Sequence, residues 1–181
     1  MAKEEKTKLK EGNISLILDG YDDLFSDFDP RPYSEKALSD DFLSECKKAA
    51  KEKLIEEEIK LRLLVPKNKR DYKNEKIIKT RLKTIFLKQF HKQQKEIKKI
   101  KLEGMLWFLL GSGIMTLATF LLKYQAKFFF KFLIIMAEPA GWFTFWEGLG
   151  KIFIDSKTKK PDHDFYHKMS KSKISFFSYN D

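Results

Sequence analysis

Residues 105–122, MLWFLLGSGIMTLATFLL, decide the architecture of this chain. The stretch has eighteen residues and no charged side chain. As a helix rising about 1.5 Å per residue it measures about 27 Å, close to the roughly 30 Å hydrocarbon thickness of a bilayer. A helix that faces water needs a polar face, and this one offers only Ser112, Thr116 and Thr119. We therefore expect a transmembrane helix.

A second apolar stretch follows after the short link 123–127. It covers residues 128–146, FFFKFLIIMAEPAGWFTFW, and its nineteen residues measure about 28 Å as a helix. Two such stretches joined by a short link predict a transmembrane hairpin over 104–150. The alternative for the second stretch is an interfacial or re-entrant segment, because polar residues interrupt it.

The lysines around the hairpin predict its orientation. Residues 90–104 hold five lysines and residues 151–165 hold four, whereas the link and the start of the second stretch hold three. Loops rich in lysine and arginine stay on the cytoplasmic side of a membrane. We expect a multi-pass protein of the cell membrane with two spans and both termini in the cytoplasm.

Small residues predict how the two spans meet. Small side chains let helix backbones approach closely, which favours association in lipid. The residues that we expect to face each other, within one chain or between chains, are Gly104, Gly111 and Ala118 in the first span and Ala137, Gly141 and Gly148 in the second.

Glu138 is the ionisable residue nearest the expected bilayer centre. An acidic residue at that depth is costly, which makes it a functional candidate. Two interpretations stay open: an ion pair with Lys131, which lies seven residues earlier and about 20° away around a helix, and a path for protons or cations. Glu147 lies four residues before Lys151, so we expect a pair there as well.

Charge divides the rest of the chain, which has 181 residues and a net charge of +10. Between residues 19 and 45 nine acidic side chains stand against two basic ones, and between 67 and 101 fourteen basic side chains stand against three acidic ones. The basic stretch suits anionic lipid headgroups. Nucleic acid is an unlikely partner because few aromatic residues accompany it. The single cysteine, Cys46, excludes an intramolecular disulfide.

Ahead of the hairpin the pattern predicts strand, helix, strand. Residues 14–18 read as a strand, a helix begins at Ser34 or Ser39 and ends near Glu58, and alternating residues 59–65 read as a second strand. Two strands alone make a poor sheet. The missing partner is either the next helix or a second copy of the chain.

These patterns give the expected organisation. The fold class is α+β: a small cytosolic domain, made of a βαβ unit plus a long helix, joined to the two-helix transmembrane hairpin. The expected segments are a disordered tail (1–12), a small α/β unit with an acidic loop (13–66), a basic amphipathic helical stalk (67–103), the hairpin (104–150) and a basic cytoplasmic tail (151–181).

The acidic loop is a candidate for binding a divalent cation. Its four aspartates are Asp22, Asp23, Asp27 and Asp29. The glycine and the closing glutamate of a calcium loop are missing at the required spacing. A solvated loop of turns is therefore the favoured interpretation, and we expect no metal and no cofactor.

Two stretches carry a family resemblance. DGYDDLFSDFDPRPYSEKALSDDFL (19–43) and EPAGWFTFWEGL (138–149) resemble a family of uncharacterised small prokaryotic proteins with a membrane hairpin. The two stretches cover about a fifth of the chain. The resemblance implies no activity, and it favours a defined fold for the acidic loop.

The sequence thus favours a non-catalytic, membrane-anchored interaction or assembly module, forming a homo-oligomer and binding an unknown cytosolic protein. The alternative is a small oligomeric channel or a transporter component that uses Glu138. A third class is a metal-dependent enzyme that uses the four aspartates of the acidic loop.

Overall fold

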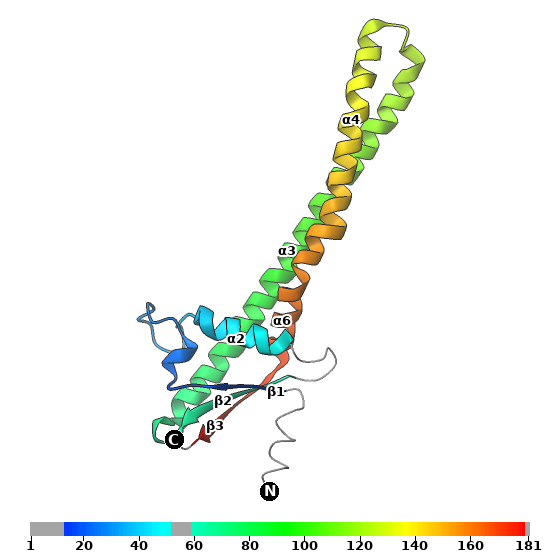
Figure 1. Ribbon diagram of the computed structural model, residues 1–181. Helices are drawn as coiled ribbons and strands as arrows, with labels where there is room; N and C mark the ends of the chain where they lie inside the picture. Colours follow the sequence, from blue (N-terminus) through cyan, green and yellow to red (C-terminus); the bar gives the residue numbers. More distant parts are fainter. Residues whose placement is uncertain (1–12, 52–58, 180–181) are drawn as a thin grey trace. The chain divides into compact units, whose positions relative to one another are not determined.

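A computed structural model describes residues 13–51 and 59–179 of the chain (Figure 1). It combines helices with a three-stranded parallel sheet. The chain divides into two compact units: residues up to 90 together with those from 164 onward form an α/β unit, and residues 91–163 form a helical unit. The predicted disordered tail and the predicted helix end near Glu58 lie outside the described residues.

The sheet belongs to the α/β unit. Its strands are β1 (Asn13–Ile17), β2 (Lys60–Pro66) and β3 (Lys173–Tyr179), all parallel, in the order β1-β2-β3. The two predicted strands are confirmed. The partner that they lacked is β3, and neither the next helix nor a second copy takes that place in the sheet.

The end of the chain corrects the predicted tail at 151–181. A π-helical turn (Lys151–Asp155), α5 (Ser156–Thr158), α6 (Lys160–Lys171) and β3 occupy most of it. Its lysines suggested a solvated tail. However, β3 alternates, with Ile174 and Phe176 buried between more accessible neighbours, which is the pattern of a strand with one covered face.

Three helices cover one face of the sheet (Figure 1). They are α2 (Asp40–Lys51), the first part of α3 (Tyr72–Leu121) and α6. As predicted, Ser39 caps α2: its hydroxyl oxygen accepts a hydrogen bond from the Phe42 N–H at 3.4 Å. The side chains of the core that are fully buried and largest are Phe25, Phe86, Ile14, Leu24, Leu61, Leu63, Ile78, Leu82, Met169 and Val65.

Along the other face of the sheet one row of side chains is apolar. Ile17, Leu64 and Phe177 stand side by side in the strand register. Ile17 is 71% exposed and Phe177 is 45% exposed. The Arg62 guanidinium lies over the Phe177 ring, 5.4 Å from its centre. Parallel sheets are usually covered on both faces, so this row is a surface on which a partner can pack.

The helical unit contains the remainder of α3 and α4 (Phe128–Gly150), which run antiparallel (Figure 1). A single turn, Leu122–Tyr124, begins the link between them. Both are long and apolar enough to cross a membrane: the candidate spans lie within Tyr72–Tyr124 and Phe128–Thr158. The two predicted helices and their short connection are therefore confirmed.

Candidate functional sites

Hydrogen bonds hold the acidic loop in a defined shape. The Asp23 carboxylate accepts from the N–H groups of Asp19 (2.6 Å) and Gly20 (3.1 Å). The Asp22 carboxylate accepts from the Tyr33 hydroxyl (3.2 Å) and pairs with Lys36 (3.1 Å). The carboxylates of these two aspartates therefore bind groups of the loop itself, which is the arrangement expected of a solvated loop of turns.

Asp29 organises the far side of the loop. Its carboxylate accepts from the Ala37 N–H at 2.7 Å and from two guanidinium nitrogens of Arg31, at 2.8 and 2.7 Å. The Arg31 hydrogen bonds, followed by the Ala37 N–H, hold the pKa of Asp29 well below its usual range. Asp27 is exposed. Within the described residues, no group of three or more His, Cys, Asp or Glu side chains is placed to hold a metal ion.

A buried polar cluster fastens the loop to the start of α3. Glu75 is almost fully buried, and its carboxylate accepts from Arg70 at 2.8 and 3.0 Å and from the Tyr21 hydroxyl at 3.2 Å. The same hydroxyl accepts from the Asp71 N–H at 2.7 Å. Burial raises the pKa of Tyr21. Sequence reasoning missed this cluster, because Tyr21 precedes Asp71 by 50 residues and Glu75 by 54.

Cys46 lies in the core of the α/β unit and is fully buried. Burial raises the pKa of its thiol to about 12. Since the thiolate is the reactive form of cysteine, this side chain acts as a small apolar residue of the core.

Glycines in the helical unit let α3 and α4 approach each other closely. A Cβ atom on Gly111 would lie 2.7 Å from the Gly141 carbonyl oxygen, and one on Gly148 would lie 2.7 Å from the Gly104 carbonyl oxygen. Real Cβ atoms do not come so near. The structure thus brings these four predicted residues together within one chain.

The rest of the contact differs in detail from the expected lines of small residues. Ala118 is buried on α3, but Ala137 on α4 is only partly buried, and Ile134 and Thr144 are buried instead. The signal for Ile134 was present in the sequence, because it precedes Gly141 by seven residues, just as Gly141 precedes Gly148.

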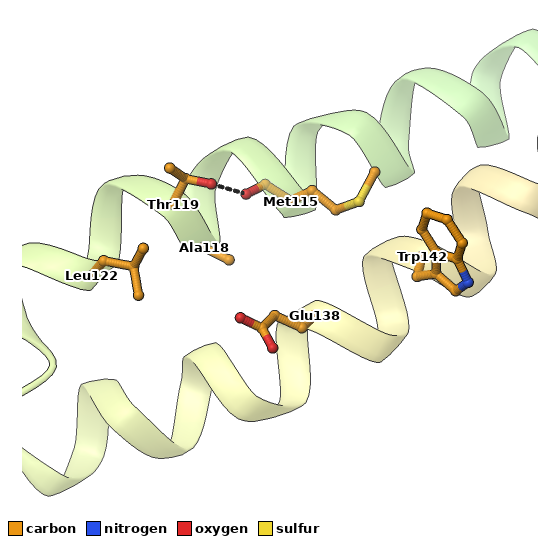
Figure 2. A pocket seen from close by; sticks show the side chains of 6 residues that line it. All are labelled: Met115, Ala118, Thr119, Leu122, Glu138 and Trp142. Carbon is orange, nitrogen blue, oxygen red and sulfur yellow. Dashed lines mark hydrogen bonds between the residues drawn. The ribbon is translucent and has the colours of Figure 1, made fainter.

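Glu138 lines a groove between α3 and α4 near their connection (Figure 2). The groove has a volume of about 370 Å³, and its lining residues are Met115, Ala118, Thr119, Leu122, Glu138 and Trp142. In Figure 2 the carboxylate lies in the space between α3 and α4, below Ala118. Over the described part of the chain no ion pair joins Glu138 to Lys131, so the structure does not show the first of the two interpretations.

Elsewhere in the helical unit, ion pairs do form. Glu147 pairs with Lys151 at 3.8 Å, which confirms the predicted pair. Glu96 of α3 pairs with Lys159, which follows α5, at 3.5 Å. The second pair was missed because its partners come from different helical segments.

Comparisons of the chain with known protein families, with characterised proteins and with solved structures find no match. The functional argument therefore depends on the geometry of the two units.

Proposed function

We propose that this chain is a membrane-anchored interaction module whose helical hairpin crosses the bilayer twice. The observation that carries the proposal is that the two apolar segments are largely exposed: only 11% and 17% of their residues are buried. The core helix of a soluble protein is mostly buried, whereas the hairpin turns large apolar side chains outward. A surface of that kind is stable in lipid and unfavourable in water.

The strand order supports two complete crossings with both ends on one side. Strands β1 and β2 precede the hairpin in the chain and β3 follows it, yet all three form one sheet. A hairpin that left its two ends on opposite sides of a bilayer would separate β3 from β2. More lysines flank the ends of the hairpin than its link, and this bias favours a location of the α/β unit in the cytoplasm.

The α/β unit supplies the surfaces for interaction. Phe28 is 97% exposed in the acidic loop, and Ile17 and Phe177 are exposed on the sheet. The apolar row of Ile17, Leu64 and Phe177 is typical of surfaces that bind proteins. We infer an unknown cytosolic protein as one partner, anionic headgroups beside the lysines that precede the hairpin as another, and a homo-oligomer as the assembled state. The resemblance to small prokaryotic hairpin proteins agrees with this proposal and remains a prediction.

Washing membranes with alkaline carbonate tests the anchoring. The full chain should stay in the membrane fraction and leave it only in detergent. The variant Phe120→Lys with Leu110→Lys places two charges on exposed positions of α3 within the apolar segment, and a lysine there costs up to about 3 kcal/mol, the value at the bilayer centre. It should insert poorly, while Lys99→Arg should behave like the native chain. Complete release of the native chain by carbonate would refute the anchor.

A channel or a transporter component that uses Glu138 is the second candidate function. The observation that favours it is the groove between α3 and α4, which the Glu138 side chain lines. The Glu138→Gln variant should abolish any cation or proton flux measured in vesicles that contain the purified chain. Unchanged flux would refute a role for the carboxylate.

A further inference from the structure

The close contacts between α3 and α4 fix the depth of Glu138 along the hairpin. Gly111 packs against the turn of α4 that contains Gly141 and Phe145, and Gly148 packs against the turn of α3 that contains Gly104 and Phe108. The groove that Glu138 lines runs along α3 from Met115 to Leu122, so Glu138 lies opposite this part of α3. That part belongs to the uncharged segment 105–122, and a carboxylate without a partner is costly inside a bilayer.

The groove offers the carboxylate no partner of its own. The Thr119 hydroxyl, the other polar group of the lining, donates to the Met115 carbonyl oxygen of its own helix at 2.9 Å. The remaining lining side chains are those of Met115, Ala118, Leu122 and Trp142. Among the described residues, no hydrogen bond or ion pair reaches Glu138.

The chemistry of this lining selects the kind of cation that fits. Ca²⁺ takes six to eight oxygen ligands and Mg²⁺ requires an octahedral set, whereas a single carboxylate is present here. An organic cation needs one counter-charge and an apolar surface around it. Trp142 adds an indole ring, the best aromatic partner for a cation. It follows Glu138 by four residues, so the two side chains lie on one face of α4.

We propose that the groove binds an amphipathic organic cation, such as a quaternary ammonium or phosphonium ion. The charge lies at the Glu138 carboxylate and the Trp142 ring, and the apolar body packs on Met115, Ala118 and Leu122. The volume of about 370 Å³ is within the range of small-molecule sites, about 300 to 1,000 Å³. This inference rests on the proposed membrane position of the hairpin, because lipid is the phase from which such a ligand enters the groove.

Equilibrium dialysis of tetraphenylphosphonium against the full chain in detergent micelles tests the site. We expect saturable binding that Glu138→Gln weakens about tenfold or more, as the loss of a charge-assisted contact predicts. Trp142→Leu should weaken it about threefold. Glu147→Gln is the matched control: it removes a carboxylate from the same helix outside the groove, and binding should not change.

Three results would overturn the proposal. They are the absence of saturable binding, equal binding of the neutral triphenylphosphine oxide, and equal losses in the Glu138→Gln and Glu147→Gln variants. A Glu138→Gln variant that binds normally but changes the mass of the particle would assign the carboxylate to contact with a second copy instead. Dialysis in micelles measures binding of the cation and does not depend on attachment to a membrane. A negative dialysis result would therefore refute the cation site alone, whereas release of the chain by carbonate would refute the anchor.

Discussion

The α/β unit and the helical hairpin bury opposite kinds of residue. The buried side chains of the α/β unit are large and apolar, including Phe25, Leu63 and Phe86. Inside the hairpin the buried positions include Gly111 and Gly141, and its leucine, phenylalanine and tryptophan side chains are largely exposed. The proposed membrane position explains both arrangements with one rule: water would solvate the polar surface of the α/β unit, and lipid would solvate the apolar surface of the hairpin.

Helix α3 contains both arrangements in one element. Leu82, in the α/β unit, is fully buried, whereas Leu117, in the hairpin, is 60% exposed. The residue type is the same, and under the proposed membrane position Leu117 faces lipid whereas Leu82 lies in a protein core. This pair of leucines therefore gives the most direct test of the comparison by mutation.

The largest effect is expected from truncation of Leu82. Leu82→Ala removes a fully buried side chain and should lower the free energy of unfolding of the α/β unit by about 2 to 5 kcal/mol. Leu117→Ala should lower it by less than about 0.5 kcal/mol, as is usual for an exposed position. Chemical unfolding in micelles, followed by near-ultraviolet circular dichroism, measures both. Equal losses from the two variants would break the comparison.

An intermediate effect is expected from enlarging a buried glycine of the hairpin. Gly111→Ala places a Cβ atom against the backbone of α4 and should destabilise the helix pair by about 1 to 3 kcal/mol through overpacking. Gly113→Ala is the matched control on the same helix, because nothing lies within 4 Å of its Cβ position. Tryptophan fluorescence during heating reports the hairpin alone, since all three tryptophans lie in it. A control variant as unstable as Gly111→Ala would refute the close contact.

The smallest effect is expected at the buried polar cluster of Tyr21, Arg70 and Glu75 at the start of α3. Tyr21→Phe removes a hydroxyl that donates to Glu75 and accepts from Asp71, which should cost about 1 kcal/mol. The native pKa of Tyr21 is raised, so above the usual tyrosine pKa of about 10 the unfolded chain loses its proton first and stability falls as pH rises.

Measuring the free energy of unfolding at alkaline pH tests the predicted fall in stability. Tyr21→Phe should lose less stability than the native chain as the pH rises above the tyrosine range. Tyr72→Phe, at an exposed position, should follow the native profile. A native profile that rises with pH in that range would contradict the raised pKa.

Local pattern was sufficient to predict much of the fold. The strands β1 and β2, a cap at one of two serines and the short link before α4 all followed from the spacing of apolar residues and from turn and cap residues close by in the sequence. The glycine contacts of the hairpin could also be predicted from the sequence, because residues spaced by seven lie on the same face of a helix.

Features that depend on distant partners could not be predicted in this way. Strand β3 pairs with β2 across more than a hundred residues, and its lysine-rich surroundings concealed its alternation. The contact of Tyr21 with Glu75 joins a loop to a helix start, and no local signal marks it. The groove at Glu138 requires the register of two helices, whereas the sequence alone suggested a pair with Lys131 on one helix.

Labelling of single cysteines in intact cells tests the central claim, that the hairpin crosses the membrane twice. Gln125→Cys places a thiol in the link between α3 and α4, and Lys157→Cys places one beyond α4. Cys46 is buried with a raised pKa and serves as an internal control that reacts only after denaturation. A membrane-impermeant maleimide should label position 125 in intact cells and position 157 only after the cells are permeabilised. The reverse pattern would contradict the predicted orientation, and labelling of both positions from the same side would contradict the two crossings.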